Sequence, residues 1–178
     1  AYFSQALKDW QVPGAAIAIV KDGEVIFSKG YGVREMGKST PVTENTLFAI
    51  GSSSKAFTTA VLGILVDEGK LHWDDPVIKY LPDFQVFDPA VTRELKIRDL
   101  ITHRIGINRA DHIWYGTKLD RDEVLHRIRD VKPKEGFRYT FGYNNLMYLT
   151  AGQIIPAVTG KSWDDFVRER IFKPLGMN

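Results

Sequence analysis

The spacing of hydrophobic residues changes partway along the chain. In the first part, an apolar run at residues 15–20 and a mixed stretch at residues 24–31 flank Asp22-Gly23, which is a strong signal for a two-residue hairpin turn. Residues 46–50 are predicted to form one more short strand. This part of the chain is therefore expected to supply the strands of the fold.

After this part, the apolar residues recur at helical spacing. Residues 56–68 form the longest such pattern, which Gly69 is expected to end because glycine is favoured just after a helix. Residues 82–94 and 131–140 are predicted to be loops. Other helices are predicted at residues 1–11, 76–81, 97–102, 120–130, 144–158 and 163–172. Nothing beyond residue 51 indicates a strand.

Strands first and helices afterwards indicate a mixed α/β chain of the α+β class, with an antiparallel sheet flanked by helices and a mainly helical lobe. We assign residues 1–51 to an N-terminal helix and hairpin, and residues 52–178 to the helical part. A hairpin this apolar has to pair with other strands and be covered before it is stable. The sheet is therefore expected to be incomplete in this chain, with C-terminal strands absent.

Composition and charge exclude several classes of function. The 24 basic and 22 acidic residues leave a formal charge of +2 and are interspersed, so no face for nucleic acid is indicated. No apolar run approaches the roughly 20 residues of a membrane span. The absence of cysteine excludes disulfides, and the four histidines lack metal-ligand spacing. A soluble protein is expected, either cytoplasmic or secreted or periplasmic after removal of a signal.

Candidate chemistry begins where the pattern turns helical. Ser52 and Lys55 are three residues apart, and positions i and i+3 share one face of a helix, so both side chains are expected to point into the same small volume. A serine hydroxyl becomes a useful nucleophile when a neighbouring amine takes its proton. The alternative is a simple helix start, because Ser52 and the two serines after it are all favoured N-cap residues.

Three short elements occur in one order along the chain. They are Ser52-x-x-Lys55, Thr102-His103 and Tyr143-x-Asn145. With these elements, the sequence resembles the class C β-lactamases and penicillin-binding-protein-like serine hydrolases, a family that also includes D-amino-acid peptidases, DD-carboxypeptidases and esterases. Further landmarks of this family run through nearly the whole chain, from residues 12–14 to residues 172–177. A β-lactamase/transpeptidase-like fold is implied.

The resemblance implies a role for each member of the constellation. Ser52 is implied to be the acylated nucleophile, Lys55 its proton acceptor, and Tyr143 the partner general base and acid. Asn145 is implied to orient the substrate through its amide. From the residues alone, packing of Tyr143 on the core is preferred to a catalytic role, and Asn145 is compatible with capping the next helix.

The residues around this constellation are predicted to be supporting ones. Family members often have Ser-Gly where this chain has Ile105-Gly106, so one hydroxyl is missing here. We therefore expect Thr102 and His103 to form structural hydrogen bonds behind the site. Four aromatic residues are candidates either for a cleft lining or for the core: Trp73, Trp114, Tyr115 and Phe141.

One element of the family pattern has no counterpart here. The family carries a later Lys-Thr-Gly-like or His-x-Gly-like triplet on a sheet strand, whose N–H forms the oxyanion hole together with that of Ser52. The nearest match, at residues 158–161, is predicted to be a helix end. Residues 172–178 resemble a mid-chain stretch of the family, so we expect the N-terminal half of a larger hydrolase. A C-terminal segment or a second chain is expected to complete its sheet.

The sequence thus predicts serine acyl transfer. Ser52 is predicted to attack an ester, amide or lactam carbonyl of a small-molecule or peptide substrate, and water then releases the acyl group, with no metal or cofactor. A peptidase or esterase is preferred to a dedicated β-lactamase. Two alternatives remain open. One is a non-catalytic or slowly acylating penicillin-binding sensor domain, and the other is an inactive fragment that needs a C-terminal partner.

Overall fold

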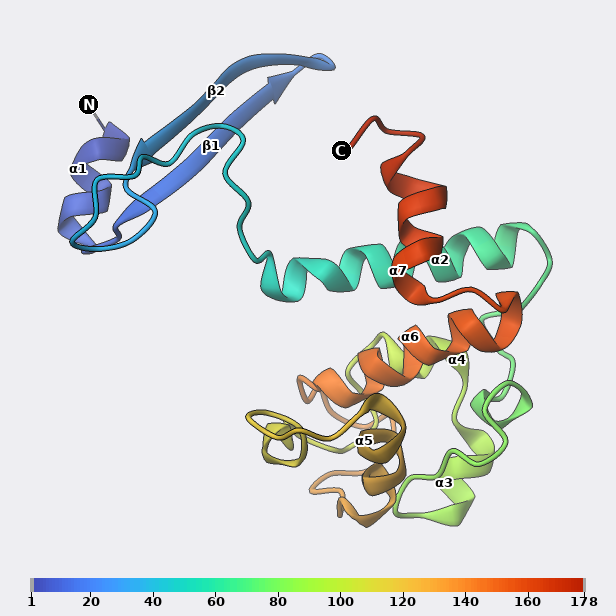
Figure 1. Ribbon diagram of the computed structural model, residues 1–178. Coiled ribbons are helices and arrows are strands. Elements are labelled where there is room, and N and C mark those ends of the chain that lie inside the picture. The colour runs from blue at the N-terminus through green and yellow to red at the C-terminus, as the bar shows by residue number, and fades with distance from the viewer. Residues whose placement is uncertain (1, 178) are drawn as a thin grey trace. The chain divides into compact units, whose positions relative to one another are not determined.

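The computed structural model describes residues 2–177, and the chain divides into two compact units after residue 50. The first unit contains helix α1 (Tyr2–Asp9) and two antiparallel strands, β1 (Gly14–Lys21) and β2 (Glu24–Gly32). These elements are blue in Figure 1. The second unit contains the remaining helices. The predicted mixed α/β class, with strands first and helices afterwards, is confirmed.

The hairpin forms where the sequence predicts it. Asp22 and Gly23 have φ angles of 52° and 81°, so both residues adopt the left-handed conformation of the turn type whose twist matches the flanking strands. Phe3 of α1 packs on Tyr31 of β2, with ring centroids 5.7 Å apart. Several apolar side chains of the hairpin remain exposed, among them Ile19, Val20, Val25 and Ile26.

The predicted strand at residues 46–50 is wrong. These residues pair with no strand of the described chain, and the Leu47 side chain is 92% exposed. An extended segment becomes a strand only when a neighbour takes up its backbone hydrogen bonds. The apolar composition of this segment suits a strand, but the pairing partner is lacking among residues 2–177.

The second unit is built around helix α6 (Asn145–Thr159), which contacts four other helices. Those neighbours are α2 (Ser54–Asp67), α4 (Ile97–Leu100), α5 (Arg121–Arg127) and α7 (Trp163–Val167). Figure 1 shows α6 in orange. The remaining elements are α3 (Pro89–Glu94), the 3-10 turns Gly51–Ser53, Val77–Lys79, Asp111–Ile113 and Ile128–Asp130, and the π-helical turn Arg168–Phe172.

The core of this unit explains the central place of α6. Its side chains Leu146, Met147 and Ile154 are almost completely buried, together with Leu62 and Leu65 of α2. The helix ends at Gly160, whose φ of 69° is the left-handed conformation that glycine favours at a helix C-terminus. The helix end predicted at residues 158–161 is therefore confirmed.

Two short helices differ from the predictions. α3 lies within the stretch predicted as loop; Asp88 caps it by accepting the Ala90 N–H, and Pro89 occupies its first turn. The start signal is present in the sequence, but six residues are too few to show a helical period. The helix predicted at residues 76–81 is only the turn Val77–Lys79, with Pro76 before its first residue.

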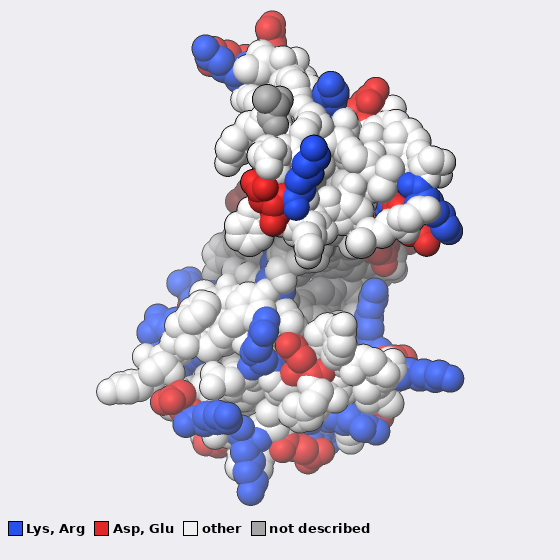
Figure 2. Space-filling model, turned by 90° about the vertical axis from the view of Figure 1, so that its left-hand side faces the viewer, with Lys and Arg blue, Asp and Glu red and all other residues white. Residues whose placement is uncertain are grey.

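Charged side chains are mixed on the surface. On the face that Figure 2 shows, lysine and arginine side chains lie beside aspartate and glutamate side chains, without a broad field of one sign. This mixture agrees with the formal charge of +2. No helix in residues 2–177 combines the length and the apolar character needed to cross a membrane.

Candidate active site

Ser52 lies in the turn that leads into α2. The residue before it, Gly51, has a φ of 52°, a conformation that favours glycine, and this bend turns the chain immediately before the hydroxyl. Ser53 occupies the N-cap position of α2 but forms no side-chain capping hydrogen bond. The hydroxyl of Ser53 therefore does not cap α2.

Two side chains contact the Ser52 hydroxyl, and a third contacts one of these two. Lys55, one turn further along α2, donates a hydrogen bond from Nζ to Ser52 Oγ over 3.1 Å. The Tyr143 hydroxyl lies 2.6 Å from the same oxygen. Lys55 Nζ also donates to Asn145 Oδ1 over 2.7 Å. The structure thus brings together the four residues predicted to form the site, although Ser52 and Tyr143 are 91 positions apart.

The Lys55 ammonium lies close to two aromatic rings. It is 4.9 Å from the ring centroid of Tyr143 and 5.3 Å from that of Tyr148, distances at which a cation is attracted to the face of a ring. Tyr148 is itself held by a hydrogen bond from its hydroxyl to the Ile101 carbonyl, 3.0 Å long. These contacts keep the half-buried Lys55 side chain directed at Ser52.

The charge of Lys55 contributes to lowering the pKa values of two neighbouring side chains. The nearby Lys55 ammonium, followed by the hydrogen bond with Ser52, lowers the pKa of Tyr143 below the usual value of a phenol, because both stabilise the phenolate. Burial, followed by the Lys55 charge, lowers the pKa of His103, because both disfavour the imidazolium. Tyr143 therefore loses its proton more readily than an ordinary tyrosine, and His103 is neutral at pH 7.

The neutral His103 ring lies behind Tyr143. Its Nδ1 accepts the Asn144 N–H over 3.1 Å, and its ring centroid is 4.5 Å from that of Tyr143. Thr102 donates from its hydroxyl to the Asp99 carbonyl over 3.3 Å. Neither polar contact involves Ser52, and the supporting role of Thr102 and His103 stays a prediction.

The two asparagines at the start of α6 have different contacts. The Asn144 side chain is fully buried; it accepts the Met147 N–H over 3.0 Å and donates to the carbonyls of Ile107 and Asn108. Asn144 is therefore the cap of α6, and the alternative that Asn145 caps this helix is wrong. The Asn145 amide instead accepts from Lys55 Nζ and donates to Asp111 Oδ1.

This difference predicts unequal losses of stability for two neighbouring substitutions. Asn144→Ala is expected to lower the free energy of unfolding by about 2–3 kcal/mol, because it removes a cap and takes a donor from the buried Ile107 carbonyl and from the Asn108 carbonyl. Asn145→Ala is expected to cost about 1 kcal/mol or less, since its amide is only partly buried. Urea unfolding of both variants measures these values. Equal losses would contradict the assignment of the cap to Asn144.

A hollow of about 470 Å³ opens beside Ser52. Ser52, Lys55 and Asn145 line its polar side, and Trp114 and Leu119 contribute to its apolar side. A hollow of this size and lining suits the acyl part of a small substrate. Of the four candidate aromatics, Trp114 lines this hollow, Trp73 packs on the core, and Tyr115 and Phe141 are largely exposed.

Two residues of the site had not been predicted from the sequence. Asp111 accepts hydrogen bonds on Oδ1 from Asn145 Nδ2, over 2.9 Å, and from Trp114 Nε1, over 3.1 Å. The guanidinium of Arg109 lies 5.5 Å from the ring centroid of Tyr143. Arg109 lies in an irregular loop and Asp111 begins the 3-10 turn Asp111–Ile113; neither segment has a periodic pattern that indicates which way a side chain points.

Known proteins resemble this chain in both sequence and structure. The beta-lactamase family model matches residues 1–178. The chain is 37% identical to the unguisins hydrolase ungD' of Aspergillus campestris, over 98% of the chain and 34% of that protein. Among solved structures, the octameric penicillin-binding protein homologue from Pyrococcus abyssi has a TM-score of 0.86 and 30% identity, over 99% of this chain and 42% of that one.

A second solved structure is the D-amino acid amidase from Ochrobactrum anthropi SV3 in complex with D-phenylalanine. It has a TM-score of 0.84 and 26% identity, over 98% of this chain and 49% of that one. The chain thus spans about a third of the curated relative and about half of the amidase. These likenesses confirm the predicted fold, with a β-lactamase/transpeptidase-like arrangement of strands and helices.

Proposed function

The chain belongs to the beta-lactamase family, and on that premise we propose that it carries the acylation site of a serine hydrolase. The observation that carries this proposal is the position of Ser52 Oγ between Lys55 Nζ at 3.1 Å and Tyr143 Oη at 2.6 Å. A nucleophile within hydrogen-bond reach of its base is the arrangement that covalent catalysis requires. The hydrolase and the amidase among the similar proteins support the same reaction class.

The proposed reaction begins when Ser52 Oγ attacks the carbonyl carbon of the substrate. The hydroxyl proton passes to the coupled pair of Lys55 and Tyr143 while the bond between Oγ and carbon forms. The same pair then returns a proton to the leaving alcohol or amine as its bond to carbon breaks. Water hydrolyses the resulting acyl-enzyme, again through this pair.

The substrate is proposed to be an ester, an amide or a lactam. The hollow beside Ser52 supports a compact acyl group, because its apolar side includes Trp114 and Leu119. The unguisins hydrolase and the D-amino acid amidase are named for hydrolase and amidase activities. We therefore prefer a peptidase, amidase or esterase to a dedicated β-lactamase.

The site is proposed to be completed by further strands, from another segment of the protein or from a second chain. The exposed apolar side chains of the hairpin, such as Val20, Val25 and Ile26, support such a partner, because exposed strands of this kind pair readily. One added strand is proposed to supply the second N–H of the oxyanion hole beside that of Ser52. Such a donor contributes about 3 kcal/mol to transition-state stability.

Covalent labelling tests the proposed function. A fluorophosphonate probe is expected to react with Ser52, and digestion followed by mass spectrometry should locate the adduct on that residue. Fluorescent penicillin and a chromogenic ester then separate the alternatives: labelling with turnover means an enzyme, whereas penicillin labelling without turnover means a sensor. An adduct on another serine, with Ser52 unmodified, would refute the proposal.

A further inference from the structure

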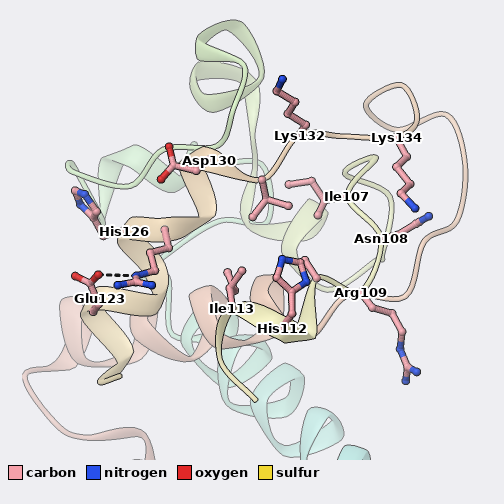
Figure 3. A pocket seen from close by; sticks show the side chains of 13 residues that line it. Ile107, Asn108, Arg109, His112, Ile113, Glu123, His126, Asp130, Lys132 and Lys134 are labelled. Carbon is pink, nitrogen blue, oxygen red and sulfur yellow. Dashed lines mark hydrogen bonds and ion pairs between the residues drawn. The ribbon is translucent and has the colours of Figure 1, made fainter. Parts of the chain in front are cut away.

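A second and larger hollow lies on the loop that carries Arg109. It measures about 920 Å³ and is lined by residues 107–110, 112 and 113, by one face of helix α5, and by residues 130–132 and 134. Figure 3 shows its lining side chains. The apolar side chains of Ile107 and Ile113 form part of its wall. The proposed acylation reaction does not use this hollow.

The charged lining of this hollow is mostly positive. It contains four cationic side chains, Arg109, Arg127, Lys132 and Lys134, and two carboxylates, Glu123 and Asp130. Arg127 Nε donates to Glu123 Oε1 over 2.6 Å, so these two charges compensate each other, as the dashed line in Figure 3 indicates. Three cationic groups and one carboxylate remain.

The remaining cations lack strong partners. Lys132 and Lys134 form no ion pair with any residue of the described chain. Arg109 is 70% exposed and lies 3.6 Å from Asp111, a distance longer than a direct hydrogen bond. In Figure 3, the end of Lys134 points toward Asn108, whereas Lys132 and Arg109 extend outward, away from Ile107 and Ile113. Positive charge therefore lies at the rim of the hollow, where it can attract an anion.

Arg109 connects this hollow to the acylation site. It lines the hollow, while its guanidinium lies 5.5 Å from the ring centroid of Tyr143. The loop between the two sites is held in place: the buried Asn144 amide donates to the carbonyls of Ile107 and Asn108, and Asn145 donates to Asp111. The positive hollow thus has a defined position relative to Ser52.

We propose that this hollow binds an anionic group of the substrate, a carboxylate or a phosphate, while the reacting carbonyl lies at Ser52. The inference rests on the proposed serine hydrolase function and narrows its substrate to acyl compounds with a negatively charged extension. Positive groups in a concave surface raise the local concentration of anions, and contacts away from the reacting bond contribute to substrate binding. A neutral substrate of the same length lacks this contribution.

Two chromogenic esters of equal length test the proposal with the full-length protein. The p-nitrophenyl monoester of suberic acid ends in a carboxylate, whereas p-nitrophenyl octanoate ends in a methyl group. The KM for the suberate ester is expected to be about fivefold lower or more, which corresponds to a few exposed charge contacts. In the double variant Lys132→Gln/Lys134→Gln this ratio should approach one, with kcat for the octanoate ester unchanged.

Lys173→Gln is the matched control, because Lys173 is exposed and lies outside the lining. Inorganic phosphate and glutarate, added separately at constant ionic strength, show which anion competes better with the suberate ester. An equal KM for the two esters in the parent protein, or an unchanged ratio in the double variant, would overturn the inference. Hydrolysis that does not depend on Ser52 would instead overturn the proposed function.

Discussion

Ser52→Ala is expected to lower kcat/KM for a chromogenic ester by on the order of 10⁴-fold or more, because no other group can form the proposed acyl-enzyme. The Ser52 side chain is exposed and forms its hydrogen bonds only with Lys55 and Tyr143 in the described chain. Its removal should therefore leave the free energy of unfolding nearly unchanged. Steady-state kinetics and urea unfolding of the variant measure the two effects.

The neighbouring serine provides the control. Ser53→Ala alters an exposed side chain that makes no capping hydrogen bond, so activity within about twofold of the parent is expected. This comparison separates loss of the nucleophile from any general disturbance of the turn Gly51–Ser53. If Ser52→Ala kept a tenth or more of the parent activity, Ser52 would not be the nucleophile.

Tyr143→Phe is expected to lower kcat by about 10²- to 10⁴-fold, the usual contribution of a positioned acid or base. The ring and its contacts with His103 and Lys55 remain, whereas the hydroxyl 2.6 Å from Ser52 Oγ is lost. Because Tyr143 is proposed to act as a base in its phenolate form, the activity of the parent should fall as the pH drops through the lowered pKa of Tyr143. The variant should lose this dependence.

Tyr139→Phe is the matched control. Tyr139 lies on the same loop and is 83% exposed, so its hydroxyl should affect neither kcat nor the pH profile. A pH profile of kcat/KM for the parent and both variants provides the measurement. If Tyr143→Phe kept the activity and the pH dependence of the parent, the proposed proton transfer through Tyr143 would be wrong.

Local sequence signals predicted much of the fold. Asp22-Gly23 predicted the hairpin turn because few residue pairs adopt two successive left-handed conformations. The pattern at residues 56–68 predicted α2, and Gly160 predicted the end of α6, since both signals act within a single helix. The strand at residues 46–50 was predicted wrongly because a strand depends on a partner elsewhere in the chain.

The sequence predicted the contacts within the site less well than it predicted the helices and the hairpin. Asn144 and Asn145 are adjacent and chemically identical, yet one is buried as a helix cap and the other faces Lys55. Their different roles follow from where α6 begins, and helix boundaries are among the least certain features of a sequence. Arg109 and Asp111 lie in a loop and a short 3-10 turn, and this segment is positioned by hydrogen bonds from Asn144 to the Asn108 carbonyl and from Asn145 to Asp111.

The sequence by itself determined that Ser52 and Lys55 share one side of the start of α2, because residues three apart in a helix are neighbours in space. Only the tertiary structure decided that the Tyr143 hydroxyl lies 2.6 Å from Ser52 and that Arg109 joins this site to a basic hollow. Contacts between residues so far apart depend on how α2 and α6 pack around a shared core. No local pattern of residues encodes that packing.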